Sequence, residues 1–253
     1  MNTQDSQASI LHSHIFKPQC FANKCFLVSG GSSGIGADIA LSLNALGAKI
    51  IAIGRDSAKL ESKRKKAINP HLFIPISKDI SQFYELDKWA LNLAKEYGSF
   101  DGAVLSVENA LEIFNINYFG NLQLIKGLLD RRAKSNIGAS FIWISSNARI
   151  KAQKGLCNYS ASKAGVNASV RSLALEIAPK YRINAISPGF TMTEMIENWS
   201  SIYDKDYIES MDKSYPLGIG KPSQITPLVC FLLSEDSTWI TGQNIIIDGG
   251  GSL

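Results

Sequence analysis

A glycine-rich stretch near the start of the chain, Ser-Gly-Gly-Ser-Ser-Gly-Ile-Gly at residues 29–36, constrains the fold more than any other feature of the sequence. An apolar run precedes it at residues 25–28, and an amphipathic run follows at residues 35–46. This order predicts a strand, a tight turn and a helix. Because the N–H groups at the start of such a helix attract anions, the turn is a candidate site for the pyrophosphate of a dinucleotide.

Three glycines in this stretch have separate predicted roles. Gly30 lets the chain turn sharply away from the strand, and Gly34 lets the backbone approach a bound phosphate. Gly36 lets the new helix pack against the sheet. Many tight turns need glycine, so an ordinary strand-to-helix turn remains the alternative for this stretch taken alone.

Strand-like and helix-like segments alternate along the rest of the chain. The further apolar runs that favour strands lie at residues 49–53, 72–76, 100–107, 140–144, 182–186 and 244–247. Helical patterns cover residues 55–67, 82–97, 110–132 and 159–178. Apolar strands separated by helices are typical of a parallel sheet covered on both faces. We therefore predict an α/β fold, a single-domain doubly wound (Rossmann) parallel sheet of about seven strands.

Three residues sharpen this prediction locally. Pro75 is awkward in a central strand, so its strand is expected near a sheet edge or to carry Pro75 near its end. Gly98 is expected to end the helix at residues 82–97. Asp56 is expected to cap the helix that follows it.

Composition excludes several classes of protein. Of the 253 residues, 45% are hydrophobic and 19% are charged, with a net charge of +4, which fits a globular domain. The basic run at residues 63–66 is interpreted as the solvated end of a helix, because a nucleic-acid surface needs further basic stripes and aromatic platforms. We therefore expect no nucleic-acid partner.

Cysteine usage and hydropathy indicate a cytoplasmic protein. The four cysteines lack metal-ligand spacing, so we expect no metal site and free thiols in a reducing compartment. Neither a signal peptide nor an apolar run long enough to span a bilayer is apparent, which predicts no membrane partner. Residues 1–20 are expected to form a flexible N-terminal extension, and residues 21–253 the Rossmann-fold domain.

A serine, a tyrosine and a lysine form a constellation that suits carbonyl reduction. Tyr159 and Lys163 are four residues apart on a predicted helix, so they share one face. Ser146 follows a predicted strand, at the sheet edge where ligands bind in this fold. The Lys163 ammonium would favour the phenolate of Tyr159, which could then exchange a proton with substrate, while Ser146 holds the carbonyl oxygen. Taken singly, these residues could equally be a surface pair and a capping serine.

Together, these motifs resemble those of the classical short-chain dehydrogenase/reductase family, including its 3-oxoacyl-acyl-carrier-protein reductases, from about residue 22 to the end. The matching segments are the glycine stretch, with Ser29 where threonine is usual, and the segments Asp79-Ile80, 117–120, Ser146, Tyr159, Lys163, 187–193, 241–243 and 248–250. The resemblance implies that Ser146, Tyr159 and Lys163 are catalytic and that Asn117 holds a proton-relay water.

The resemblance also implies a cofactor site, a substrate lid and an assembly. The implied cofactor-binding residues are Ser29, Gly30, Ser32, Ser33, Gly34, Ile35, Gly36, Arg55, Asp79, Ile80, Tyr159, Lys163, Pro188, Gly189, Thr191 and Thr193. Residues at about 191–215 are the implied lid, with apolar side chains at helical spacing. The long helices at residues 110–132 and 159–178 are expected to pair across subunits in a homodimer or homotetramer.

One segment departs from the family pattern. The family usually carries Asn-Asn-Ala-Gly after the fourth strand, whereas this chain has Ser-Val-Glu-Asn-Ala at residues 106–110. The span from there to Asn117 is also short. Because this segment normally helps to wall the cleft, the sequence leaves two explanations open, a more open cleft or residues missing from the chain.

The residues after the second strand favour NADP(H) over NAD(H). An NAD site usually places an acid there to bind the ribose 2′-hydroxyl, whereas this chain has Gly54 followed by Arg55. Arg55 can bind a 2′-phosphate by charge and by stacking, although it could also simply face solvent.

We therefore expect an NADP(H)-dependent oxidoreductase that interconverts a ketone and a secondary alcohol on a small-molecule or carrier-bound substrate. Arg149, Lys151 and Lys154 lie between the serine and the tyrosine and are expected to be solvated, although they could steer an anionic substrate. Two alternatives remain, a dinucleotide-binding sensor or scaffold with reduced catalysis, and an epimerase or dehydratase, which usually needs a larger substrate domain.

Overall fold

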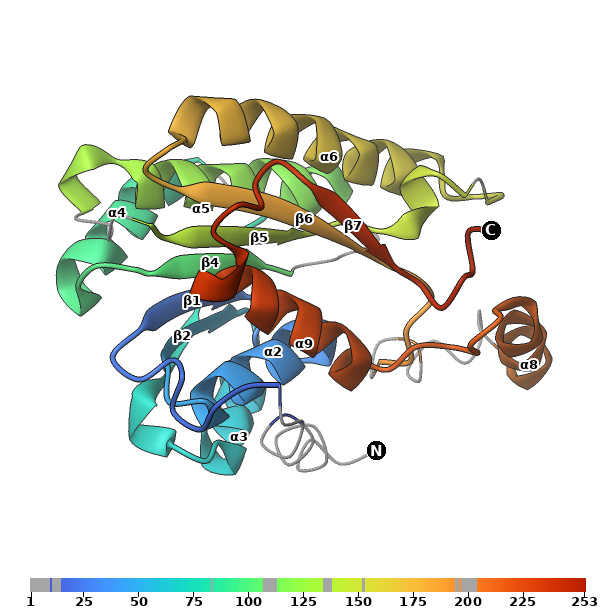
Figure 1. Ribbon diagram of the computed structural model, residues 1–253, viewed down its shortest axis with the longest axis horizontal. Coiled ribbons are helices and arrows are strands. Elements are labelled where there is room, and N and C mark those ends of the chain that lie inside the picture. Colours follow the sequence, from blue (N-terminus) through green and yellow to red (C-terminus); the bar gives the residue numbers. More distant parts are fainter. Residues whose placement is uncertain are drawn as a thin grey trace.

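The computed structural model describes residues 10, 15–82, 84–106, 113–133, 138–151, 153–193, 196 and 204–253. In these residues a seven-stranded parallel sheet lies between two layers of helices (Figure 1). The strands are β1 (Cys25–Ser29), β2 (Lys49–Gly54), β3 (Phe73–Ser77), β4 (Gly102–Leu105), β5 (Ser140–Ile144), β6 (Arg182–Pro188) and β7 (Asn244–Ile247). The predicted fold class, a single-domain Rossmann sheet, is confirmed.

The order of the strands determines where a ligand can bind. The sheet runs β3-β2-β1-β4-β5-β6-β7, so β1 pairs with β2 on one side and with β4 on the other. The chain therefore reverses its direction of winding next to β1. In doubly wound sheets the crevice for a ligand opens at such a reversal, at the carboxyl ends of the strands.

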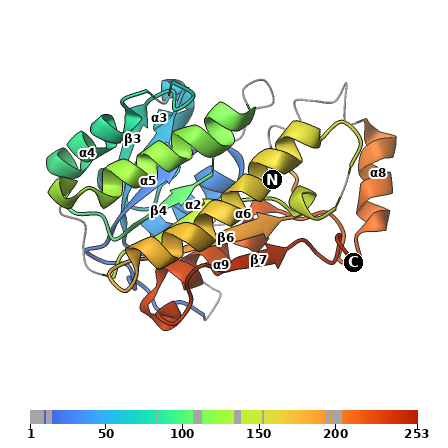
Figure 2. The same ribbon diagram turned by 90° about the horizontal axis from the view of Figure 1, so that it is seen from above.

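Among the described residues, three helices cover each face of the sheet. The helices α2 (Gly34–Ala45), α3 (Ser57–Lys66) and α9 (Pro222–Leu233) lie on one face, and α4 (Leu86–Tyr97), α5 (Asn121–Leu129) and α6 (Cys157–Ile177) lie on the other (Figures 1 and 2). The helix α8 (Lys205–Ser214) lies apart from both layers (Figure 1). Short helical turns are η1 (Pro70–Leu72), η2 (Asn115–Gly120), η3 (Arg131–Ala133), η4 (Asn147–Arg149) and η5 (Glu235–Ser237).

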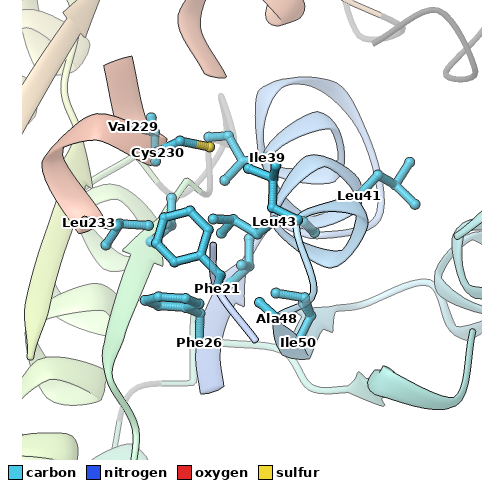
Figure 3. Packing of buried hydrophobic residues seen from close by; sticks show 14 of the residues in the cluster. Phe21, Phe26, Ile39, Leu41, Leu43, Ala48, Ile50, Val229, Cys230 and Leu233 are labelled. Carbon is cyan, nitrogen blue, oxygen red and sulfur yellow. The ribbon is translucent and has the colours of Figure 1, made fainter. Parts of the chain in front are cut away.

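Each face of the sheet has its own hydrophobic core because successive side chains of a strand point to opposite faces. In β1, Phe26 and Val28 join the core under α2 and α9, whereas Cys25 and Leu27 join the core under α4, α5 and α6. Figure 3 shows the first of these cores, where the Phe21 and Phe26 rings lie edge to face and Cys230 of α9 belongs to the same cluster. The near-continuous apolar strands of the sequence are thus explained by burial on both sides.

The three local predictions are confirmed. Pro75 lies in β3, which is the edge strand of the sheet. Gly98 follows α4 with φ 94°, a conformation that favours glycine. The carboxylate of Asp56 accepts a hydrogen bond from the Lys59 backbone N–H at 2.9 Å and so caps α3.

The long helix expected at residues 110–132 is wrong in part. A π-helical turn, η2, runs over Asn115–Gly120 before α5 begins, and α5 ends at Leu129. A Cβ atom on Gly120 would lie 2.2 Å from the Ile80 carbonyl oxygen, so this turn packs directly against the end of the segment after β3. Residues 107–112 lie outside the described part of the chain.

One further expectation needs correction, and two buried side chains are seen in the N-terminal segment. The basic run at residues 63–66 is not solvated throughout, because Lys63 is buried, whereas Lys65 and Lys66 are exposed. Within the N-terminal segment expected to be loose, Ile10 and Phe16 are buried in the core under α2 and α9. The apolar side chains of that segment are the reason, since they cover core surface that would otherwise face water.

Candidate active site

The glycine turn has the geometry of an anion-binding loop. Gly30 and Gly34 have φ values of 73° and 55°, which L side chains rarely adopt. A Cβ atom on Gly36 would lie 2.4 Å from the Gly30 carbonyl oxygen, so Gly36 allows α2 to approach the turn itself. The residue preceding α2, Ser33, makes no side-chain hydrogen bond to the helix start. The first N–H groups of α2 are therefore not capped by that side chain and can bind an anionic group.

A pocket opens in front of this turn, at the carboxyl edge of the sheet. Its lining residues are Gly30, Ser32, Ser33, Gly34, Ile35, Ile53, Gly54, Arg55, Lys78, Asp79, Ile80, Ser106, Ile116, Ile144 and Thr193. Most of the predicted cofactor residues are thus brought together by the fold. The predicted cofactor residues outside this lining are Ser29, Gly36, Tyr159, Lys163, Pro188, Gly189 and Thr191.

Arg55 and Lys78 are both cationic at one end of the pocket. Arg55 is exposed, and its carbonyl oxygen accepts from the Ser77 hydroxyl at 2.9 Å. The Lys78 backbone N–H donates to the Gly54 carbonyl oxygen at 2.9 Å, and its ammonium lies 5.6 Å from the centre of the Trp89 ring. Lys78 was missed by sequence reasoning, although its position directly before Asp79 could have identified it.

Lys163 and Tyr159 are placed together by α6. Tyr159 lies in the first turn of the helix, and the Lys163 ammonium lies 5.5 Å from the centre of its ring. Lys163 is 1% exposed, and its Nζ donates to the carbonyl oxygen of Ile144 at 3.1 Å. Because Ile144 also lines the pocket, this bond connects the buried cation to the pocket wall.

Ser146 lies two residues after β5 and is buried. Its Oγ accepts a hydrogen bond from the Ala148 N–H at 3.1 Å and caps the turn η4. Ser146 therefore has the capping role that the sequence offered as an alternative. It leaves the Ser146 hydroxyl proton available for a substrate oxygen, because a hydroxyl both accepts and donates.

Asn117 lies inside the π-helical turn η2 and is 1% exposed. Its Nδ2 donates to the Ser162 hydroxyl at 3.1 Å, and its backbone carbonyl oxygen accepts from the Trp143 indole N–H at 3.3 Å. Its Oδ1 is buried and has no hydrogen-bond partner among the residues that the structure describes. A buried acceptor of this kind normally needs a partner, so a polar ligand or water fits beside it.

The segment after β6 closes one side of the site. Thr193 lines the pocket, and Thr191 Oγ1 donates to the Gly189 carbonyl oxygen at 2.9 Å. The Phe190 N–H donates to the hydroxyl of Tyr215, which is buried at the end of α8. The expected helical spacing of the second half of the lid is confirmed by α8. Residues 194–195 and 197–203 of that lid lie outside the described part of the chain.

The expectation that the cations before Tyr159 are solvated is wrong for two of them. The Arg149 guanidinium donates to the Ser187 hydroxyl at 3.2 Å, and burial lowers its pKa. The Lys151 ammonium donates to the Gly251 carbonyl oxygen and lies 5.2 Å from the centre of the Tyr215 ring. Ser187 of β6 and Gly251 near the C-terminus supply these partners. Lys154 is exposed, as expected.

Within the described ranges, no three His, Cys, Asp or Glu side chains gather where they could hold a metal ion. Of the helices seen in the structure, none combines the length and apolar character needed to cross a membrane.

Comparisons with known proteins agree with this geometry. A family model described as enoyl-(acyl carrier protein) reductase matches residues 30–252. The L-xylulose reductase of Caenorhabditis elegans is 32% identical over 250 residues, covering 92% of this chain and 97% of that protein. The 3-oxoacyl-[acyl-carrier-protein] reductase of Thermotoga maritima is 30% identical over 243 residues, covering 90% and 97%. A solved short-chain dehydrogenase/reductase of Brucella melitensis, a glucose/ribitol dehydrogenase, superposes with a TM-score of 0.84 at 25% identity, covering 94% and 100%.

The chain belongs to the short-chain dehydrogenase/reductase family. It is thus an oxidoreductase of a family whose members use a nicotinamide dinucleotide. The residues present fit such a cofactor, since the two left-handed glycines and the uncapped start of α2 form a cradle for its pyrophosphate. Asp79 and Ile80 line the same pocket.

This short-chain dehydrogenase/reductase departs from its family after β4, as the sequence indicated. Ser106 lines the pocket, and its N–H lies 3.3 Å from both the carbonyl oxygen and the hydroxyl of Ser29. The end of β4 is therefore tied to the end of β1 without the usual family motif. Residues 107–112, which carry the rest of this departure, lie outside the described part of the chain.

Proposed function

We propose that this protein is an NADP(H)-dependent oxidoreductase that interconverts a ketone and a secondary alcohol, with Tyr159 as the acid/base group. One observation carries the proposal. The buried Lys163 ammonium lies beside the Tyr159 ring and bonds the carbonyl oxygen of a residue in the pocket wall. A cation in that place favours the phenolate form of the tyrosine, so the phenol can exchange a proton near neutral pH.

The roles of the other site residues follow from their positions. The cofactor, when bound, supplies or accepts the hydride. Ser146 donates its hydroxyl proton to the substrate oxygen while its Oγ remains bonded to the Ala148 N–H. Asn117, whose Oδ1 is buried and unpartnered, holds a water that returns protons to the buried lysine. Pro188, Gly189 and Thr191 support Thr193 at the pocket wall.

The preference for NADP(H) rests on charge. Gly54 offers no carboxylate to a ribose hydroxyl, and Arg55 and Lys78 lie on the same lining. The Arg55 guanidinium and the Lys78 ammonium can both bind a phosphate, and the guanidinium can also stack on the adenine base of the cofactor.

The substrate is a small-molecule or carrier-bound carbonyl compound. Two relatives are named for reducing such compounds, the xylulose reductase and the 3-oxoacyl-carrier reductase. Because Arg149 and Lys151 are engaged within the protein, Lys154 is the loop cation that remains for steering an anionic substrate. All four cysteines are free thiols, which supports a cytoplasmic enzyme.

The variant Tyr159→Phe tests the proposal. It removes the phenolic proton but keeps the ring, so turnover of NADPH with a panel of ketones, aldehydes and 3-oxoacyl esters should fall at least about a hundredfold. NADPH affinity, measured by fluorescence titration, should stay within about threefold of the wild type.

Tyr97→Phe is the matched control. Tyr97 ends α4, and its carbonyl oxygen bonds Lys49 at the start of β2, so it lies at the amino edge of the sheet, away from the site. Its replacement should leave turnover unchanged. Near-normal turnover of Tyr159→Phe would contradict the mechanism. A wild-type protein that binds NADPH but reduces no carbonyl compound would favour a sensor or scaffold instead.

A further inference from the structure

The side chain of Asn121, which no sequence motif singled out, links the glycine turn to the segment that carries Asn117. It is 1% exposed at the start of α5. Its Oδ1 accepts from the Ser29 hydroxyl at 3.1 Å, and its Nδ2 donates to the carbonyl oxygens of Ile116 at 2.9 Å and Asn117 at 3.2 Å. Both hydrogens of the amide and its oxygen are thus engaged.

One end of this link lies at the cofactor turn. Ser29 is the last residue of β1, directly before Gly30, and it is fully buried. Its hydroxyl also lies 3.3 Å from the Ser106 N–H at the end of β4. The strand ends on either side of the crevice therefore meet at this hydroxyl.

The other end of the link lies at the proposed proton relay. Asn117 O accepts from Trp143 as well as from Asn121, and the Asn117 side chain reaches Ser162, the neighbour of Lys163. A π-helical turn is rare and usually needs a local cause. Asn121 provides one, since its amide donates back to two successive carbonyl oxygens of the turn.

We propose that Asn121 is a positioning residue that couples the dinucleotide-binding turn to Asn117 through Ser29. The coupling rests on the proposed function, because it takes Asn117 as part of the proton relay. It follows from the geometry, since one buried amide cannot shift at the glycine turn without pulling on the two carbonyl oxygens beside the relay. Cofactor binding should therefore order the π-helical turn.

Four variants and the wild type test this coupling. Ser29→Ala keeps both Nδ2 bonds and removes the link, and the Ser106 N–H, which also lies near the Ser29 hydroxyl, keeps the Ser29 carbonyl oxygen as acceptor. Asn121→Leu removes the amide with a side chain of similar size. The double variant completes a mutant cycle, and Ser29→Thr keeps the hydroxyl as the matched control. For each protein, NADPH affinity, kcat, melting temperature and hydrogen exchange of residues 115–120 with and without NADPH are measured.

Ser29→Ala should weaken NADPH binding and lower kcat, each about five- to tenfold, which is the scale of one buried hydrogen bond. Hydrogen exchange over 115–120 should slow on NADPH binding in the wild type and in Ser29→Thr, but not in Ser29→Ala. The double variant should lose no more activity than Asn121→Leu alone, because both remove the same connection. If Asn121→Leu does not fold, the comparison of Ser29→Ala with Ser29→Thr in NADPH affinity, kcat and hydrogen exchange tests the coupling without the mutant cycle.

A merely structural role gives a different result. It predicts that Ser29→Ala has a lower melting temperature. Below the melting range, its NADPH affinity, its kcat and its hydrogen exchange over 115–120 would match the wild type. That outcome overturns the proposal. Additive losses in the mutant cycle overturn it too. A wild type that reduces no carbonyl compound refutes the proposed function, whereas NADPH affinity and exchange still show whether the coupling exists.

Discussion

Arg55 and Lys78 give the pocket two cations at the end where the second strand and the third strand finish, and they carry the first prediction. A charge-assisted hydrogen bond is worth about 1.5–3 kcal/mol, or roughly ten- to a hundredfold in affinity. NADPH should therefore bind more tightly than NADH by that factor. Arg55→Ala should remove most of the difference and leave NADH affinity unchanged, as measured by fluorescence titration of both cofactors.

Arg131→Ala is the matched control for Arg55, because Arg131 is exposed in η3 and does not line the pocket. Lys78→Ala should reduce NADPH affinity by a smaller factor, since its ammonium is shared with the Trp89 ring. Equal affinities of the wild type for NADPH and NADH would show that Arg55 does not bind the 2′-phosphate and is an ordinary surface residue.

Gly54→Asp should lower NADPH affinity further, because the new carboxylate repels a 2′-phosphate. The structure adds a constraint that the sequence did not show. A Cβ atom on Gly54 would lie 3.0 Å from the Ser32 hydroxyl, so that side chain must rotate. The ratio of NADH to NADPH affinity should therefore reverse, with both affinities somewhat reduced. A variant that still prefers NADPH would contradict this prediction.

Lys163 should set the pH at which Tyr159 becomes effective. In Lys163→Ala the phenolate loses its nearby cation, so the rise of alcohol oxidation with pH should shift to higher pH. Cofactor binding should weaken as well. The measurement is the pH profile of kcat for oxidation, and an unchanged midpoint would show that Lys163 does not tune the tyrosine.

At the scale of secondary-structure elements, the C-terminal end of α9 is held by a buried arginine from β6. The Arg182 guanidinium donates to the carbonyl oxygens of Leu232, Ser234 and Ile240, each at 3.1 Å. The first two lie at or just after the end of the helix, where carbonyl groups lack helical partners and the helix dipole favours a cation. Arg182 thus connects α9 to the sheet.

Arg182→Met should lower the free energy of unfolding by at least about 2 kcal/mol, since it removes several hydrogen bonds to a charged group while the carbonyl oxygens stay buried. Urea denaturation measures the change. Arg182→Lys should recover only part of it, because an ammonium cannot match the planar fork of donors. Arg131→Met, at an exposed position in η3, is the control and should change stability by less than about 0.5 kcal/mol.

At the scale of the whole molecule, the outer face of α6 carries small and apolar residues that are exposed in the described part of the chain. Ala161, Ala164 and Ala168 are exposed, and Leu175 is 85% exposed. We expect this face to pair with a second copy in a homodimer or homotetramer, as closed symmetric assemblies bury such surfaces.

Light scattering at micromolar concentration should give two or four times the mass of the chain. Leu175→Glu should shift this mass toward the monomer, because pairing would bury a charge. Ile68→Glu, at an exposed site before β3 on the far edge of the sheet, should not. A monomer mass for the wild type would contradict the expected assembly.

The sequence by itself determined the fold class and the approximate position of every strand, because apolar runs bounded by glycine, proline and polar residues reflect burial on both faces of a sheet. It also identified the glycine turn, Ser146 and the Tyr159–Lys163 pair, since their spacing is local and helix geometry fixes which residues share a face.

Tertiary structure alone decided the features that depend on partners far apart in the chain. The π-helical turn at Asn115–Gly120 could not be predicted from a helical pattern. Its carbonyl oxygens accept from the side chain of Asn121, which also bonds to Ser29, 92 residues away in the chain. Lys151 and Arg149 looked solvated for the same reason, since Gly251 and Ser187, their partners, reach the site only when β6 and β7 pair beside β5.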